Sequence, residues 1–189
     1  FCSLDLNVRL RLRGELPNIL KECNASGLMV THDPEEAMAI CDKVAVMNSG
    51  QIHQLDKPYQ IINNPKSLFV SSFILGNNII KISREKNKLR SIVGNIEVDN
   101  LISNQKVEFI SISPKSFSIK LSTNGKGKVI AKEFLGEYFV YKVNISNINL
   151  RVRTNIKQDI EVGQKCEIST IKGSQVFLFP GGYKRKITQ

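Results

Sequence analysis

The 189-residue sequence has no tryptophan, only two histidines and no long hydrophobic run. Its longest apolar cluster lies near Leu68–Leu75 and is interrupted by two serines. A helix that crosses a bilayer needs about 20 apolar residues, so this cluster is too short to span a membrane. The composition therefore predicts a soluble or peripheral protein.

Cysteine is also scarce, and the four thiols are far apart in the sequence: Cys2, Cys23, Cys41 and Cys166. No two of them have the short spacing of a zinc knuckle or a thioredoxin-type pair. We interpret them as small buried thiols in a reducing cytoplasm, and we predict no metal site in this chain. The first ten residues also lack the basic and then apolar pattern of a signal peptide.

Positive charge, in contrast, is abundant, since 27 Lys and Arg residues outnumber 17 Asp and Glu residues. A net charge of +10 is compatible with nucleic acid, an anionic membrane surface or an anionic ligand. The charge is nevertheless spread along the chain, and the only tight runs are Arg9–Arg13 and Tyr183–Lys186. Runs of this kind usually form a solvated face, which is our interpretation of both.

The first 76 residues alternate between helical and strand patterns. A helix is predicted over Leu6–Ser26, with Asp5 as its N-cap, Gly27 as its stop and a kink or split at Pro17. The other predicted elements are a short buried strand at Leu28–Thr31, a helix at Pro34–Cys41, a hairpin of Lys43–Met47 and Gln51–Leu55, and helices at Pro58–Asn63 and Pro65–Leu75.

Beyond Gly76 the helical periodicity disappears, and short runs rich in Val, Ile, Phe and Tyr alternate with turn residues. This pattern predicts a small all-β sandwich or barrel. We therefore place a domain boundary near Asn77. The predicted strands are Lys106–Ile112, Ser116–Leu121, Gly127–Phe134, Tyr138–Val143, Leu150–Arg153, Lys165–Thr170 and Gln175–Phe179.

His32 is the first candidate for a functional residue, because it follows the predicted strand Leu28–Thr31 directly. Open α/β sheets bind ligands at the carboxyl ends of their strands, and an imidazole can donate a hydrogen bond to a phosphate oxygen. The alternative is a structural histidine whose nitrogens are satisfied by backbone carbonyls.

The motifs around His32 resemble those of the nucleotide-binding subunits of ATP-binding cassette (ABC) transporters. The matching segments, in chain order, are Phe1–Asp5, similar to the D-loop; Val30–Asp33 with Glu35–Ala37, similar to the switch-histidine loop; Asp42–Met47 with Gly50–Ile52, similar to the terminal hairpin; and Pro58, Asn64–Pro65, Phe69–Val70, Phe73–Ile74 and Gly76–Asn77, similar to the connector of importer ATPases.

The second half is similar to the regulatory (TOBE-type) domain that follows such ATPases, a small barrel related to the OB-fold. The resemblance rests on Gly127–Gly136, Tyr138–Val143, Val162–Gly163 and Phe177–Pro180. The chain departs from the family at Ser113–Lys115, where Arg-Pro-Glu is common. This resemblance implies an α/β C-terminal portion of a P-loop NTPase domain over residues 1–76 and an all-β, OB-like barrel over residues 77–189.

The same resemblance implies a role for each of three residues. In the family, two subunits enclose two ATP molecules, with His32 contacting the γ-phosphate and the attacking water as the catalytic residue. Asp5 and Ser3 would contact nucleotide across the dimer. ATP and Mg²⁺ are the implied cofactors, but no Gly-x-x-x-x-Gly-Lys-Ser/Thr loop occurs here, so most of their ligands are expected in a preceding segment. We therefore expect a C-terminal fragment that is inactive by itself.

The implied partners are a second ATPase subunit, membrane permease subunits and, indirectly, a solute-binding protein, at the cytoplasmic face of the membrane. The segment Phe73–Ile80 favours the polyamine or ferric iron importers.

Two alternatives differ in class. The first is a truncated, non-catalytic dimerisation or regulatory module. The second is an OB-fold protein that binds nucleic acid, which requires aromatic side chains on a basic face for base stacking. The relevant phenylalanines lie among aliphatic residues, as core residues do, so we predict no nucleic-acid partner. They are Phe109, Phe117, Phe134 and Phe139.

Overall fold

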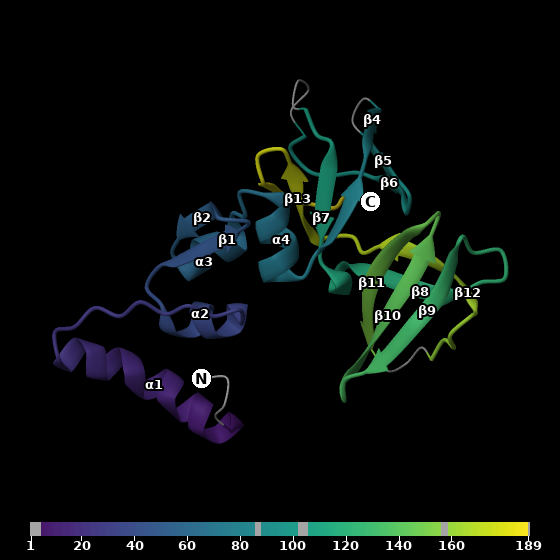
Figure 1. The fold of residues 1–189 in the computed structure, drawn as a ribbon. Coiled ribbons are helices and arrows are strands. Elements are labelled where there is room, and N and C mark those ends of the chain that lie inside the picture. The colour runs from purple at the N-terminus through teal and green to yellow at the C-terminus, as the bar shows by residue number, and fades with distance from the viewer. Residues whose placement is uncertain (1–4, 86–87, 102–105, 156–158, 189) are drawn as a thin grey trace. The chain divides into compact units, whose positions relative to one another are not determined.

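The computed structural model describes residues 5–85, 88–101, 106–155 and 159–188 (Figure 1). These residues form two compact units, residues 1–63 and residues 64–189. The predicted assignment of residues 1–76 and 77–189 to two kinds of domain stays a prediction, although the compact units divide at Asn63. Of the helices in the described ranges, none is long and apolar enough to cross a membrane.

The first unit is mostly helical and contains one hairpin. Its elements are α1 (Leu6–Glu22), α2 (Pro34–Ile40), β1 (Val44–Asn48), β2 (Gln51–Asp56) and α3 (Pro58–Asn63). Helix α1 begins as predicted, because the Asp5 carboxylate accepts hydrogen bonds from the backbone N–H groups of Asn7 and Val8 at 2.8 and 3.1 Å. It includes Pro17 without splitting, since one missing N–H donor leaves the neighbouring turns bonded, and it ends at Glu22 rather than at Ser26.

The predicted hairpin is present, and its turn lies between the two predicted strands. Ser49 and Gly50 form its two-residue turn, and both have positive φ values, 50° and 76°. Such turns match the right-handed twist of the paired strands. Val44 and Val46 alternate inward from β1 and are buried, and Ile61 of α3 is fully buried in the same unit.

The predicted strand at Leu28–Thr31 is wrong. This segment forms neither strand nor helix, and the side chains of Leu28 and Val30 are 96% and 92% exposed. A strand requires backbone partners, and within the described residues β1 and β2 pair only with each other. An apolar run with β-branched residues thus has no sheet to join.

The second unit begins with α4 (Leu68–Leu75), which Ser67 caps and which ends at Gly76 in the left-handed conformation. Within the described residues, three antiparallel sheets follow, in the orders β11-β10-β9-β12-β8, β14-β13-β7-β3 and β4-β5-β6. Their strands are β3 (Asn78–Lys81), β4 (Ser83–Glu85), β5 (Lys88–Ser91), β6 (Gly94–Ile96), β7 (Phe109–Ile112), β8 (Phe117–Leu121), β9 (Gly127–Phe134), β10 (Tyr138–Ile145), β11 (Ile148–Asn155), β12 (Lys165–Thr170), β13 (Gln175–Phe179) and β14 (Tyr183–Lys186).

The core of the second unit is continuous across these sheets. The edge strands of the five-stranded sheet, β8 and β11, contact each other, and α4 contacts β3 and β7. The largest fully buried side chains of this unit are Tyr141, Phe117, Ile80, Leu89, Ile96, Ile110, Ile112, Ile119, Leu150, Leu178 and Ile187.

The sequence suggested that the run Tyr183–Lys186 is only a solvated face. In the structure this run forms strand β14, which pairs with β13. Pairing uses the backbone, so long charged side chains do not prevent it at the edge of a sheet. The guanidinium of Arg185 lies 5.8 Å from the ring centroid of Tyr183, within the range of a cation–π contact.

Candidate functional site around His32

The loop that carries His32 is held by hydrogen bonds on both sides of that residue. The Thr31 hydroxyl donates to the Glu36 carboxylate at 2.9 Å and accepts from the backbone N–H of Asp33 at 3.0 Å. The Asp33 carboxylate accepts from the N–H of Glu35 at 2.9 Å and so caps α2. These bonds fix the backbone immediately before and after His32.

Glu36 anchors this loop from the first turn of α2. Its residue exposure is only 3%, and a buried carboxylate is unfavourable unless it is paired. Arg13 of α1 supplies the pairing charge, because its Nη2 lies 3.5 Å from Glu36 Oε1 and 3.6 Å from Asp33 Oδ2. Helices α1 and α2 are thereby connected through the same side chains that fix the loop.

His32 itself is exposed, and its imidazole has no hydrogen-bond partner among the described residues. The structural alternative, an imidazole satisfied by backbone carbonyls, is therefore not what the described part of the chain shows. The sequence predicted that His32 follows the end of a strand. In the structure it lies in a bend shortly before α2. The loop presents one polar group, the imidazole, while both neighbouring side chains are engaged.

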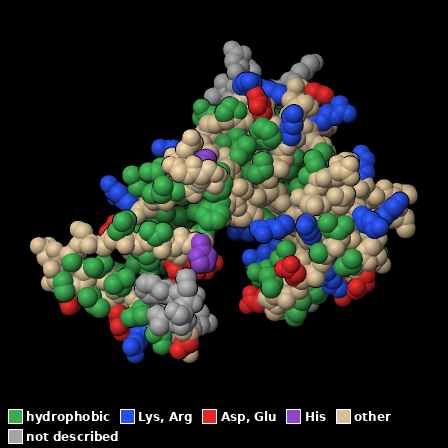
Figure 2. All heavy atoms as spheres, viewed as in Figure 1, with side chains coloured by type: hydrophobic (Ala, Val, Ile, Leu, Met, Phe, Trp, Pro, Cys, Tyr) green, Lys and Arg blue, Asp and Glu red, His purple; other side chains and the backbone are tan. Residues whose placement is uncertain are grey.

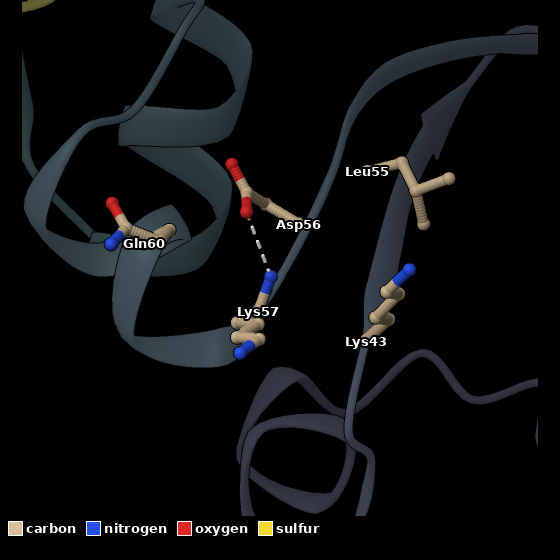
Figure 3. Close-up of a pocket in the computed structure, with 5 residues that line it drawn as sticks. All are labelled: Lys43, Leu55, Asp56, Lys57 and Gln60. Carbon is tan, nitrogen blue, oxygen red and sulfur yellow. Dashed lines mark hydrogen bonds between the residues drawn. The ribbon is translucent and has the colours of Figure 1, made fainter.

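A separate pocket of about 510 Å³ lies where β2 meets α3 (Figure 3). The Asp56 carboxylate within it accepts the backbone N–H of Lys57 at 3.0 Å. None of the predicted site residues lines this pocket. Its lining residues are Lys43, Leu55, Asp56, Lys57 and Gln60.

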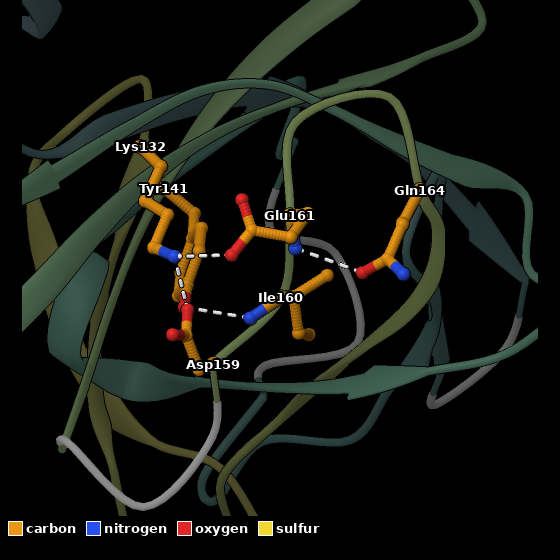
Figure 4. Close-up of polar contacts among 6 residues, drawn as sticks. All are labelled: Lys132, Tyr141, Asp159, Ile160, Glu161 and Gln164. Carbon is orange, nitrogen blue, oxygen red and sulfur yellow. Dashed lines mark hydrogen bonds and ion pairs between the residues drawn. The ribbon is translucent and has the colours of Figure 1, made fainter.

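In the described part of the second unit, Lys132 of β9 contacts two carboxylates (Figure 4). Its ammonium donates to Asp159, and to Glu161 Oε1 at 2.9 Å, and these two acceptors, Asp159 first, raise the pKa of Lys132. In the same segment the backbone N–H of Ile160 donates to the buried Tyr141 hydroxyl at 3.1 Å. These contacts tie the chain before β12 onto β9 and β10, which is a structural role.

Similarity to known proteins indicates the family of the chain. No profile of a known protein family matches the chain. Individual curated proteins do match, and three of them share the name spermidine/putrescine import ATP-binding protein. The chain is 31% identical over 164 residues to the protein of Mesomycoplasma hyopneumoniae strain J, 37% over 143 residues to that of Mesoplasma florum and 33% over 150 residues to that of Clostridium acetobutylicum.

The chain belongs to the ABC-type import ATP-binding proteins. The three alignments cover 84%, 72% and 77% of the chain. They cover only 36%, 41% and 42% of the relatives, so the chain spans well under half the length of the proteins it matches.

The structure places the three predicted site residues of this family unevenly. Ser3 lies outside the described residues. Asp5 is exposed and its carboxylate is occupied as the cap of α1. No hydrogen bond or ion pair joins Asp5 to His32 within the described chain. Their roles as ligands of nucleotide, and that of His32 in catalysis, stay predictions.

In the sequence, Glu36 lies in the first turn of the predicted helix Pro34–Cys41, where a carboxylate suits the helix dipole, and this was the only role expected of it. Arg13 was not singled out. Both side chains are instead largely buried and form an ion pair. A signal was present, because Arg13 lies three and seven residues before Leu16 and Leu20 and so shares their face of α1. A charged residue on the apolar face of a helix indicates a buried partner of opposite charge.

Proposed function

We propose that this chain is the C-terminal part of the ATP-binding subunit of an ABC-type importer. Residues 1–76 would complete the ATPase domain, and residues 77–189 would form a regulatory domain of the TOBE type. The family membership and the chain order of the motifs support this proposal. The contact between β8 and β11, which brings the two edges of the five-stranded sheet together, supports a small OB-like barrel.

His32 would donate a hydrogen bond to the γ-phosphate of ATP and orient the attacking water. The observation that carries this role is its exposed imidazole without a partner in the described chain, on a loop fixed at Thr31 and Asp33. Phosphoryl transfer depends mostly on positioning and charge stabilisation, so a rigid donor suits it. Ser3 and Asp5 would contact nucleotide across the dimer.

Mg²⁺ would accompany ATP and neutralise charge on the phosphates. The carboxylates beside His32 are poorly suited to hold it, because Asp33 caps α2 and pairs with Arg13, and Glu36 is buried against Thr31 and Arg13. Residues outside this chain would supply most of the metal ligands. The chain by itself would then not hydrolyse ATP.

The partners would be a second copy of the subunit and the membrane permease, with a solute-binding protein acting indirectly, at the cytoplasmic face of the membrane. The first unit leaves large apolar side chains exposed, among them Leu28 and Val30, and such surfaces mark contacts with other polypeptide. Figure 2 shows hydrophobic side chains on the surface of the helical part. The rest of the ATPase domain would cover Leu28 and Val30.

The transported solute would be a polyamine. The names of the curated relatives refer to spermidine and putrescine import, and the sequence of Phe73–Ile80 favours the same branch. Uptake of radiolabelled spermidine by cells that express the complete transporter tests this assignment. Uptake that is unchanged when the subunit is deleted would exclude it.

The test of the proposed mechanism is His32→Ala in the complete subunit that contains this chain. ATP hydrolysis should fall by about 10²-fold or more, as expected for the loss of a positioned group, while nucleotide affinity changes little. His53→Ala, which removes the other histidine of the chain, is the matched control and should hydrolyse ATP like the unmodified protein. Equal turnover of all three proteins would overturn the role of His32.

A non-catalytic regulatory or dimerisation module is the second candidate. The core of residues 64–189 favours it, because the described residues of that unit form a continuous buried cluster of their own. An antibody against this unit distinguishes the two candidates in cell extracts. A product close to the relatives in size supports the ATPase subunit, and a product of only 189 residues supports the module.

A further inference from the structure

We propose that Arg13 is a positioning residue that sets the orientation of His32. This inference rests on the proposed function, because it assigns to α1 a part in holding the residue that would contact the γ-phosphate. Arg13 would not touch nucleotide. It would act through the two carboxylates, Asp33 and Glu36, that bond the loop on either side of His32.

The geometry gives Arg13 two contacts to the loop. Its Nη2 lies 3.6 Å from Asp33 Oδ2, and Asp33 is the residue after His32. The same nitrogen lies 3.5 Å from Glu36 Oε1, while the other Glu36 oxygen accepts from Thr31, the residue before His32. One guanidinium on α1 is therefore linked to both neighbours of the imidazole.

Burial makes these contacts strong enough to position a loop. The side chains of Arg13 and Glu36 are only 17% and 4% exposed, so solvent screens their attraction weakly. Asp33 is 35% exposed and contributes less. An arginine suits this buried place because a guanidinium is more weakly hydrated than a lysine ammonium and always carries its charge.

Helix α1 also contains a matched control for these contacts. Arg11 Nε lies 3.5 Å from Glu15 Oε1, the same separation as in the Arg13–Glu36 pair, but the two side chains are 72% and 52% exposed. An exposed pair of this kind contributes little to stability. Arg11→Gln thus removes an arginine from the same helix without affecting the His32 loop.

The first experiment uses the 189-residue chain and requires no ATPase activity. Amide hydrogen exchange of residues 31–36 is measured for the unmodified chain, Arg13→Gln and Arg11→Gln. Arg13→Gln should accelerate exchange in this segment at least tenfold, and Arg11→Gln should leave it unchanged. Equal exchange in all three proteins would show that Arg13 does not hold the loop.

The second experiment measures kcat and KM for ATP in the complete subunit. Arg13→Gln should lower kcat by about 10- to 100-fold with KM changed less than about threefold, because a displaced catalytic group loses rate rather than binding. Arg13→Lys should restore only part of kcat, since the charge returns as a strongly hydrated ammonium on a flexible stem. A purely structural arginine would lower the amount of folded protein and leave kcat per folded molecule intact.

If Arg13→Gln prevents folding, the double variant Arg13→Gln with Glu36→Gln removes both members of the buried pair and leaves only the partly exposed Asp33 without its cation. It should fold and still show the reduced kcat. Wild-type kcat in the folded double variant would overturn the inference.

The two proposals fail in different ways. A normal turnover of His32→Ala refutes the proposed function, and the exchange experiment still decides whether Arg13 holds the loop. A strong effect of His32→Ala together with an Arg13→Gln protein that behaves like Arg11→Gln refutes the positioning role alone.

Discussion

The two compact units differ in how completely they bury their own apolar side chains. Among the described residues of the first unit, the buried hydrophobic side chains are Val44, Val46 and Ile61, while Leu28 and Val30 are almost fully exposed. The second unit has a continuous core. A two-stranded hairpin with short helices cannot shield a core by itself, whereas three sheets can enclose one. Under the proposed function, the rest of the ATPase domain would cover these exposed side chains of the first unit.

The largest test of this contrast compares the same substitution in both units. Leu150 of β11 is 1% exposed and Leu28 is 96% exposed. Leu150→Ala should lower the free energy of unfolding by about 2–5 kcal/mol, because it leaves a cavity, and Leu28→Ala should change it by less than about 0.5 kcal/mol. Urea denaturation of the chain measures both values. Equal losses would contradict the contrast.

A second test uses glycines and predicts opposite signs. A Cβ at Gly125 would overlap the backbone carbonyl of Cys166 in β12, so Gly125→Ala should cost about 1–3 kcal/mol through backbone displacement. A Cβ at Gly14, inside α1, meets no atom within 4 Å. Gly14→Ala should therefore stabilise the helix by about 0.5–1 kcal/mol.

Thermal unfolding followed by circular dichroism checks this second pair. A higher melting temperature for Gly14→Ala beside a lower one for Gly125→Ala is the expected result. Destabilisation by Gly14→Ala would mean that this face of α1 is covered in solution.

The smallest perturbation is alkylation of the native thiols, with Cys2 replaced by serine because it lies outside the described residues. Burial raises the pKa of the Cys166 thiol, and burial together with the nearby Asp42 raises the pKa of Cys41. A raised pKa leaves less thiolate at a given pH, and the thiolate is the nucleophile. Iodoacetamide at pH 8 should thus modify exposed Cys23 first and buried Cys166 last.

Mass spectrometry of the alkylated peptides gives the order of modification. Raising the pH should accelerate modification of Cys166, and urea should abolish the order by unfolding the chain. Rapid modification of Cys166 in the native protein would show that the second unit opens readily.

Local patterns were sufficient to predict several elements with strong periodicity and clear turn residues at their ends. Helix α3 and strands β9, β12 and β13 have the predicted bounds, and the Asp5 cap is confirmed. Strand β14 was missed because its run of charged side chains does not have the apolar pattern of a strand. Its backbone nevertheless pairs with β13. The strand expected at Leu28–Thr31 was wrong because its pattern describes a residue preference and not the presence of a neighbouring strand.

The candidate site likewise has one part that the sequence predicted and another that only the structure showed. The chain order of the family motifs is a property of the sequence, and it was enough to single out His32, Asp5 and Ser3. The similarity to import ATP-binding proteins confirmed the family. Arg13 was interpreted only as part of a charged run, and Glu36 only as a partner of the helix dipole. Their pairing links residues 23 positions apart, which no local spacing rule detects.

The sequence alone determined the family, the hairpin and the helix Pro58–Asn63 before Asn77, the β character after it, and the histidine that follows an apolar run. Those features depend on motif order, periodicity and turn chemistry, which are local. Only the tertiary structure decided that Leu28–Thr31 lacks a sheet, that Tyr183–Lys186 adds a strand, and that Arg13 pairs with Glu36 beside His32. These outcomes depend on backbone partners and buried charges brought together from distant parts of the chain.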